Sequence, residues 1–475
     1  MSDGDQAGKV SRRSLLCAAA VAPLLPGRAA SAAAPDGVTD EQRSALKGAN
    51  AEASLAPDLL LPPQDLDWWR DAKFGVFVHW GLYAIPARGE WHMFNDKVPP
   101  DEYAALARRF NPRHYDPDAW AELANQAGAR YMVLTTRHHD GFALFASHAS
   151  VGHFDAPHSA ARRDLVAPWV RAVRRHGLRV GFYYSPLDWR FPAYFHPREM
   201  PDNARLLKQQ TYGQVEELMR NYGPVDILWY DGGWLAHQGT DADAAWFWEP
   251  DKLNRIVRRH QPKIVINPRS GWQGDYDEEE GPAPITGPIR ARPWEKTFSL
   301  NSAWGYVPET QVMSADAVVT LLVDAVVRNG NVLANVGPDA DGVIPPIQAR
   351  ALREVGRWLE RYGRAVYGTR PGPLQPVDGV WGMTQQGDRA YLFVHSWPTA
   401  ELVLPPMPGR VISLRNLSGE GVAWRSGPDG LTVSVEARYR GQPVTVLEIV
   451  MAARRGSRSD EGQGAATRID GGRRA

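Results

Sequence analysis

The chain has almost no cysteine, no net charge and no long apolar segment. Its 475 residues include one cysteine, Cys17, and 54 basic against 54 acidic residues. A net charge of zero gives no overall field to attract nucleic acid or an anionic membrane, so neither is expected as a partner. No stretch reaches 18 uninterrupted apolar residues, so no membrane-spanning helix is expected. One thiol cannot form an internal disulfide, and these absences favour a self-sufficient core and an uncharged partner.

The length is enough for a domain of barrel size and a smaller second domain. Aromatic residues make up 10% of the chain and include 18 tryptophans. Flat aromatic faces suit the apolar faces of sugar rings, although most tryptophans in any protein are core residues. Composition therefore favours a carbohydrate ligand only weakly.

The first 34 residues have the pattern of a targeting segment. Residues 11–16 (SRRSLL) are a twin-arginine start, an apolar stretch runs to Leu25, and residues 30–32 (ASA) form a small-residue cleavage site. We expect residues 1–34 to be a twin-arginine-type signal peptide and the protein to be exported, either to the periplasm or out of the cell. Cys17 lies inside this segment, so the mature chain is expected to contain no cysteine.

From about Trp68 onwards, short β-rich runs alternate with amphipathic helical runs, which is typical of a parallel sheet with crossover helices. We predict an α/β domain over residues 60–370 with a (β/α)8-like, TIM-type barrel. Asp116 and Asp164 are expected to cap two of its helices. The expected strands are 74–79, 131–136, 178–184, 226–230, 263–267 and 331–336, and further helices are expected at 209–222, 251–259, 315–327 and 347–362.

After residues 371–373 (PGP) the helical pattern stops. Five alternating runs, 389–395, 401–404, 411–416, 431–435 and 445–451, predict a small antiparallel β-sandwich over residues 374–453. Residues 454–475 are rich in Gly, Ser and Arg and are expected to be a disordered tail. Residues 278–293 are acidic and then proline-rich, and are expected to be a long loop.

Polar side chains gather at the carboxyl ends of the predicted barrel strands, where the active sites of such barrels are built. They are His79, His138 with His139, Tyr183 with Tyr184, Asp231, and Asn267 with Arg269. Asp231 follows an apolar strand in LWYDGGW, so its carboxylate is placed to face a ligand; a turn or N-cap aspartate is the alternative for this segment alone.

Two other segments could supply functional groups. His138 and His139 are adjacent, so both can serve one site only where the chain turns, as Asp140 and Gly141 suggest. A single buried histidine or a metal pair are the alternatives, but metal-binding histidines more often have intervening residues. Residues 274–280 (GDYDEEE) carry five acids on an expected loop, where a solvated face is the usual interpretation and a second functional carboxyl group the other.

In sequence order, eight segments together resemble the glycoside hydrolase family 29 α-L-fucosidases: residues 74–81 (FGVFVHWG), 89–91 (GEW), 137–142 (RHHDGF), 183–185 (YYS), 229–231 (WYD), 267–269 (NPR), 294–295 (WE) and 331–338 (NVLANVGP). The resemblance covers residues 66–369, and the β-sandwich after them also matches that family's architecture. It implies hydrolysis of a fucosylated glycan without a metal or other cofactor.

The resemblance also implies roles for individual residues. Asp231 matches the position of the nucleophile, and Glu280 aligns best with the general acid/base. Here the chain departs from the family pattern, because Glu278 and Glu279 stand where a Thr-Pro or similar pair is usual, so Glu278, Glu279 and Glu295 remain alternatives. The residues matching the fucose pocket are His79, Glu90, Trp91, His138, His139, Tyr183, Trp229 and Arg269.

Retention at the sugar carbon requires two carboxyl groups roughly 5 to 5.5 Å apart, one ionised and one protonated. We expect this separation for Asp231 and Glu280, with an apolar wall such as a tryptophan against the methyl group of fucose. Two other functions stay open: a fucose-binding protein with a catalytically impaired barrel, and a metal-dependent hydrolase using His79, His138, His139 and Asp231. The sequence gives no indication of linkage specificity or oligomeric state.

Overall fold

The computed structural model describes residues 54–194, 197, 199–232, 249–308 and 311–452. The expected signal peptide, the expected tail at 454–475 and Trp234 lie outside these residues. Within the described ranges, no helix is long and apolar enough to cross a membrane.

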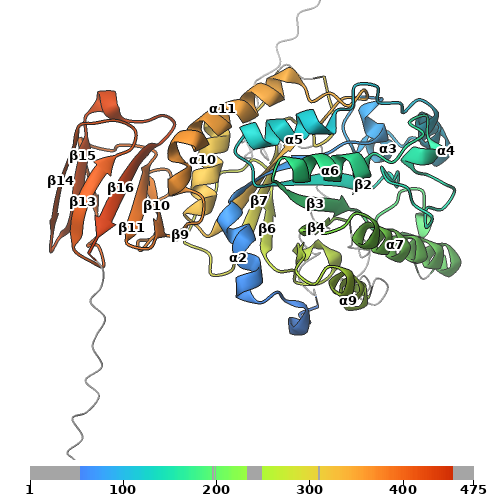
Figure 1. The fold of residues 1–475 in the computed structure, drawn as a ribbon, viewed down its shortest axis with the longest axis horizontal. Helices are drawn as coiled ribbons and strands as arrows, with labels where there is room; N and C mark the ends of the chain where they lie inside the picture. Colours follow the sequence, from blue (N-terminus) through green and yellow to red (C-terminus); the bar gives the residue numbers. More distant parts are fainter. Residues whose placement is uncertain (1–53, 195–196, 198, 233–248, 309–310, 453–475) are drawn as a thin grey trace, which may run out of the picture. The chain divides into compact units, whose positions relative to one another are not determined.

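Eight parallel strands form one curled sheet in the order β5-β4-β3-β2-β1-β8-β7-β6. Figure 1 labels five of them, β2, β3, β4, β6 and β7. They are β1 (Phe74–Val78), β2 (Tyr131–Arg137), β3 (Arg179–Tyr184), β4 (Ile227–Tyr230), β5 (Val265–Ile266), β6 (Asp277–Glu280), β7 (Trp294–Ser299) and β8 (Gly330–Val336). The two end strands, β5 and β6, are joined through Asp275. Its N–H donates to the Ile266 carbonyl and its carboxylate accepts from the Ile266 N–H, both at 2.8 Å. The predicted barrel-like α/β fold is therefore confirmed.

Strands β1 to β5 and β8 are mostly apolar because both faces of the sheet are covered. Alternate residues point to opposite faces, so each of these six strands contributes to two clusters. Phe77, Val133, Tyr183, Trp229 and Leu333 pack together inside the curled sheet. Their sequence neighbours belong to the larger core cluster, which also includes the buried helix residues.

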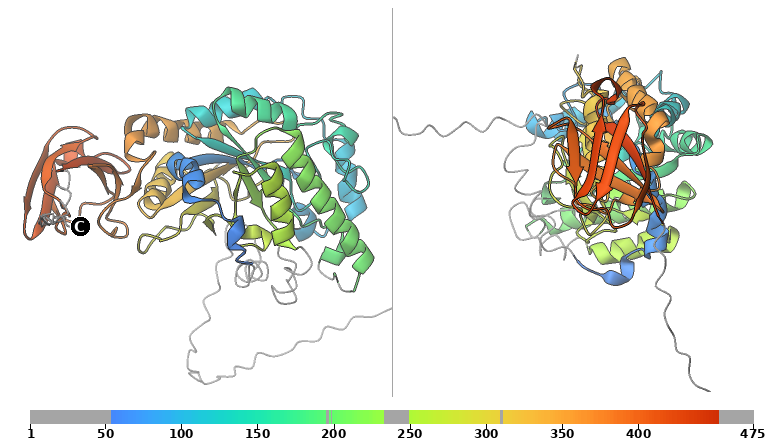
Figure 2. Two further views of the ribbon diagram at one scale, coloured as in Figure 1. Left: turned by 60° about the horizontal axis from the view of Figure 1, so that its bottom comes forward. Right: turned by 90° about the vertical axis from the view of Figure 1, so that its left-hand side faces the viewer.

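Helices cover the outer face of the sheet (Figures 1 and 2). The predicted caps are present: Asp116 accepts from the N–H groups of Asp118 and Ala119 at 3.0 and 3.1 Å, and Asp164 accepts from Val166 and Ala167 at 2.8 Å. The helices are α2 (Pro63–Ala72), α3 (His92–Asn95), α4 (Pro100–Ala104), α5 (Pro117–Gln126), α6 (Val166–Arg175), α7 (Pro201–Asn221), α9 (Pro250–His260), α10 (Ala315–Val326) and α11 (Pro346–Tyr362). Helix α7 begins eight residues before the predicted residue 209, at a proline suited to a first helical turn.

The expected loop at 278–293 is partly wrong, because its first residues belong to β6. Charged residues can form this strand since each face of it meets cations: Glu278 and Glu280 contact Arg269, whereas Glu279 contacts Arg290 and Lys296. Strand β7, which pairs with β6 and β8, was also not predicted.

The C-terminal strands form two antiparallel sheets, one ordered β13-β16-β11-β10-β9 and the other β12-β15-β14. The strands are β9 (Arg370–Pro371), β10 (Trp381–Gln386), β11 (Arg389–Val394), β12 (Glu401–Leu404), β13 (Val411–Asn416), β14 (Val422–Gly427), β15 (Gly430–Val435) and β16 (Thr445–Met451). Leu392 and Leu447 from the first sheet share a buried cluster with Leu402 and Val433 from the second, which confirms the predicted sandwich. Strands β9, β10 and β14 were not predicted.

Candidate active site

A cavity opens at the carboxyl ends of the barrel strands, the rim where the active sites of such barrels are built. Strands β1 to β6, or the residues just after them, each contribute to its wall. The lining residues are Phe77, His79, Trp91, His138, His139, Tyr183, Trp229, Asp231, Arg269, Glu280 and Trp304. Nine of the ten residues proposed from the sequence therefore meet at one cavity, and the exception is Glu90.

Asp231 is surrounded by hydrogen-bond donors. Oδ2 accepts from the Tyr183 hydroxyl at 2.9 Å and lies 3.4 Å from Nε2 of His139. Oδ1 accepts from Nη1 of Arg269 at 3.2 Å and from the N–H of Gly232 at 3.0 Å. Burial alone raises the pKa of Asp231, but the hydrogen bond from His139, the charge of Arg269 and the Tyr183 hydroxyl together lower it well below its usual range. The carboxylate is therefore ionised at neutral pH.

His79 presents a neutral ring nitrogen to the cavity. Its Nδ1 lies 2.7 Å from Oδ1 of Asn335, whose amide nitrogen donates to the Trp304 carbonyl at 2.7 Å. Because that carbonyl only accepts, the amide oxygen must face His79, and Nδ1 must carry the proton. Burial lowers the pKa of His79 to about 3. Nε2 is then left as an acceptor for a ligand hydroxyl.

His138 and His139 both face the cavity because the chain turns directly after them. The N–H of Gly141 donates to the His138 carbonyl at 3.0 Å, and Gly141 has a φ of +82°, which favours glycine. The His138 ring stacks on Tyr183 at 5.4 Å, and its buried Nδ1 has no partner among the described residues. Burial lowers the pKa of His138 well below its ordinary value. A bound hydroxyl would satisfy this nitrogen.

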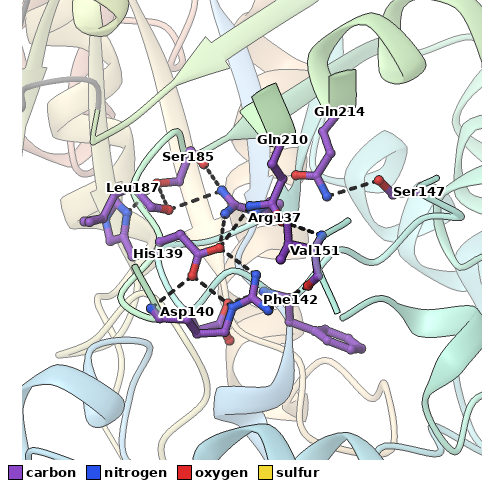
Figure 3. Close-up of polar contacts among 12 residues, drawn as sticks. Arg137, His139, Asp140, Phe142, Ser147, Val151, Ser185, Leu187, Gln210 and Gln214 are labelled. Carbon is purple, nitrogen blue, oxygen red and sulfur yellow. Dashed lines mark hydrogen bonds and ion pairs between the residues drawn. The ribbon is translucent and has the colours of Figure 1, made fainter. Parts of the chain in front are cut away.

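His139 is held by a buried polar network behind the cavity (Figure 3). Its Nδ1 lies 2.7 Å from the Ser185 hydroxyl. Arg137 donates to the carbonyls of Ser185 and Leu187 and, at 2.5 Å, to the Asp188 carboxylate. Asp188 is fully buried and also accepts from Arg190 and Gln210, so it ties the loop after β3 to the end of β2.

Four glutamates were candidates for a second carboxyl group, and the structure separates them. Only Glu280 lines the cavity, where it accepts from Nη2 of Arg269 at 2.5 Å. Glu278 lies behind Arg269, and Glu279 is on the other face of β6. Glu295 is buried inside the barrel, where it accepts from the Tyr131 hydroxyl at 2.6 Å. Burial raises the pKa of Glu295 to about 7.

Glu90 lies beneath the loop that carries Trp304. Its carboxylate accepts from the N–H of Gly305 at 2.7 Å, and burial raises its pKa to about 7. Trp91, the next residue, lines the cavity.

The sequence analysis did not identify Phe77 or Trp304 as site residues. Both form part of the apolar wall of the cavity. Phe77 is two residues before His79 on the same strand face, so strand periodicity could have identified it. Trp304 follows β7, the strand that was not predicted.

The described residues contain no group of three or more His, Cys, Asp or Glu that could hold a metal ion. Some of the histidine nitrogens already have partners: Nδ1 of His79 is bound to Asn335, and Nε2 of His139 faces Asp231. This arrangement fits neutral and charged hydrogen-bonding groups around a sugar better than a metal centre.

Known proteins with similar sequences are α-L-fucosidases, in agreement with the arrangement of the site residues. The sequence model of the α-L-fucosidase family matches residues 60–364. Tissue α-L-fucosidase of Mus musculus is 31% identical over 449 residues, covering 84% of this chain and 94% of the relative.

Solved structures show the same fold. α-L-Fucosidase isoenzyme 1 of Paenibacillus thiaminolyticus is 35% identical with a TM-score of 0.73, covering 82% of this chain and 99% of that one. A Bacteroides thetaiotaomicron GH29 α-L-fucosidase, trapped as a covalent intermediate in complex with 2-fluoro-fucosyl fluoride, is 27% identical with a TM-score of 0.74, covering 83% and 97%. The chain belongs to the α-L-fucosidase family of glycoside hydrolases.

Proposed function

We propose that this chain is an exported retaining α-L-fucosidase that hydrolyses terminal α-L-fucosides by double displacement. The observation that carries the proposal is the pairing of Asp231, an ionised carboxylate held by donors on both oxygens, with Glu280, the one glutamate among the described residues that lines the same cavity. The covalent intermediate trapped in the Bacteroides thetaiotaomicron relative supports the same chemistry here.

In the first step Asp231 attacks the anomeric carbon and the glycosidic bond breaks. The leaving oxygen takes the proton of Glu280, and the fucosyl group becomes an ester of Asp231. In the second step Glu280, now ionised, takes a proton from water. The hydroxide oxygen bonds to the anomeric carbon and the ester bond breaks, which regenerates Asp231 as a carboxylate and Glu280 as an acid.

The other cavity residues bind the sugar in this proposal. His79 accepts from a hydroxyl through Nε2, His138 bonds to a further hydroxyl, and Arg269 donates, while His139 lines the cavity and holds Asp231. Such bonds strengthen as positive charge develops on the ring, so they accelerate the reaction as well as holding the substrate. Trp304 and Phe77 are placed as the apolar wall for the methyl group.

The test is to incubate the purified protein with an aryl α-L-fucoside and a panel of fucosylated oligosaccharides, and to follow the first anomer released by NMR. Release of α-L-fucose before mutarotation is expected. Asp231→Ala should abolish turnover, and near-native turnover of this variant would show that the nucleophile is elsewhere. Fucose binding without release of any aryl group would instead favour an impaired binding protein.

The proposed export depends on residues 1–34, and we also propose the division into residues 60–370 and 374–453 with a tail at 454–475. N-terminal sequencing of protein recovered outside the cytoplasm should begin near residue 35. Replacing Arg12 and Arg13 by lysine should retain the protein in the cytoplasm, and unchanged export would exclude the twin-arginine route.

A further inference from the structure

Successive glutamates of β6 have different surroundings because strand side chains alternate. Glu279 points to the outer face, where it contacts Arg290 and, at 2.6 Å, Nζ of Lys296. Glu278 and Glu280 point inward, and both accept from Nη2 of Arg269, at 2.6 and 2.5 Å. Of these three residues only Glu280 reaches the cavity.

Glu278 is bound more completely than Glu280. One of its oxygens accepts from Nε and Nη2 of Arg269, at 2.8 and 2.6 Å, and the other accepts from the Thr297 hydroxyl at 2.6 Å. Its side chain is 4% exposed. Two nitrogens of the guanidinium are thereby fixed, and the third, Nη1, is directed at Asp231. Glu278 therefore determines how Arg269 lies across the site.

The carboxyl groups around Arg269 outnumber the positive charges there. A single guanidinium, Arg269, faces three carboxyl groups: Asp231, Glu278 and Glu280. If all three were ionised, two negative charges would be uncompensated in a mostly buried site, so one carboxyl group is expected to keep its proton. Asp231 has four donors and Glu278 has three, whereas Glu280 accepts from Arg269 alone among the described residues. Burial raises the pKa of Glu278, and the charge of Arg269 and the Thr297 hydroxyl oppose that rise.

The other titratable groups around the site add no positive charge that would neutralise these carboxylates. On the other elements, Glu295 and Glu90 have pKa values raised to about 7 by burial, and burial raises the pKa of Tyr183 and Tyr276 well above 10. His79 is neutral, and His139 is turned towards Asp231. Lys296 and Arg290 lie on the outer face with Glu279.

We propose that Glu278 is a positioning residue that fixes Arg269 across the site and, through its charge, keeps the proton on Glu280 until the leaving oxygen takes it. The inference rests on the proposed roles of Asp231 and Glu280. Two effects of Glu278 act in the same direction. It repels a second charge on Glu280, and it competes with Glu280 for the same guanidinium nitrogen.

The experiment compares kcat/KM against pH for the full chain and three variants on an aryl fucoside and a fucosylated oligosaccharide. In Glu278→Gln the alkaline limb should move to lower pH by about one unit, because a negative charge beside the proposed acid is lost. Glu279→Gln removes the same charge one residue away on the opposite face and should leave the limb in place. Glu278→Asp keeps the charge and should keep the limb near its original pH.

Thermal melting of each variant confirms folding. If Glu278→Gln does not fold, Glu278→Thr, an uncharged β-branched residue suited to a strand, should give the same shift. The inference would be overturned if the alkaline limb of a folded neutral Glu278 variant lay at the same pH as that of the wild type. It would also be overturned if the Glu278 and Glu279 variants shifted the limb by the same amount. A 10²-fold or larger loss of kcat/KM at every pH, with activity restored by azide, would also overturn the inference, since Glu278 would then be the acid/base itself. An inactive wild-type chain overturns the proposed function and this inference together.

Discussion

The hydroxyl of Tyr183 donates a 2.9 Å hydrogen bond to Oδ2 of Asp231. The two residues are on neighbouring strands, with Tyr183 inside β3 and Asp231 directly after β4. The phenol cannot give up its proton at working pH, because burial raises the pKa of Tyr183 well above 10. Tyr183 is therefore a permanent donor that keeps the carboxylate ionised and in one orientation.

We predict that Tyr183→Phe lowers kcat/KM by about 10- to 100-fold, since a hydrogen bond to a charged group contributes about 1.5 to 3 kcal/mol. Tyr184 is the matched control. It is the next residue, but its hydroxyl donates to Gln214 at 2.9 Å, away from the cavity. Steady-state kinetics should show a large loss for Tyr183→Phe and little change for Tyr184→Phe. Similar losses in both variants would show that Asp231 does not depend on this bond.

Glu280→Ala should reduce turnover of substrates with poor leaving groups by about 10² to 10⁴, because the leaving oxygen loses its proton donor. Aryl fucosides with good leaving groups need little protonation, so they should lose much less. Azide, which needs no general base, should restore part of their turnover.

Glu295→Gln is the control for this prediction. The amide keeps an oxygen for the Tyr131 hydroxyl inside the barrel, away from the cavity. Glu295 also accepts from Nε1 of Trp229, a residue of the cavity wall, at 3.3 Å, so any loss of turnover should be equal for good and poor leaving groups. A dependence on leaving group in Glu295→Gln but not in Glu280→Ala would reverse the assignment.

Asp188→Asn should destabilise the protein by about 3 to 5 kcal/mol. The substitution leaves the fully buried guanidinium of Arg137 without its charged partner, and unpaired buried charges cost this much. Denaturant unfolding measures the change. Asp202→Asn removes an exposed pair with Arg205 and should cost less than about 1 kcal/mol. A comparable small cost for Asp188→Asn would mean that the network in Figure 3 does not stabilise the fold.

Stability should fall as the pH decreases below about 6.5, partly because of His79. Burial lowers the pKa of His79 to about 3 in the folded chain, whereas an unfolded histidine titrates near 6.5. Between these values the unfolded state binds more protons, so this contribution is complete above pH 6.5 and is lost as the pH falls. The loss approaches about 1.4 kcal/mol for each pH unit.

Urea unfolding at pH 7, 6 and 5 tests this sign and slope. His79→Gln should give a flatter dependence on pH, whatever its effect on stability at pH 7. His114→Gln is the control, because the His114 side chain is 71% exposed. The prediction is wrong if both variants keep the wild-type slope.

Local sequence determined much of this protein. Continuous apolar runs specify strands that are buried on both faces, as in β1 and β2, and Asp116 and Asp164 start helices by binding free backbone N–H groups. Because the carboxyl ends of parallel strands meet at one rim, the positions of His79, His138, Asp231 and Arg269 at those ends were sufficient to predict that they would lie together.

Only the tertiary structure showed which of the candidate glutamates lies in the cavity with Asp231. Local sequence does not distinguish Glu278, Glu279 and Glu280 from one another. Because the segment is highly charged, its sequence predicted a loop rather than strand β6. The partners that make a strand possible there come from elsewhere in the chain: Arg269 on one face, and Arg290 with Lys296 on the other. Hydrogen bonds across such distances in sequence, and the pairing of β6 with β7, place Glu280 in the cavity and its neighbours outside it. Local sequence preferences do not include these contacts. The family resemblance therefore favoured Glu280 but left its neighbours open, and only the folded chain places Glu280 in the cavity without them.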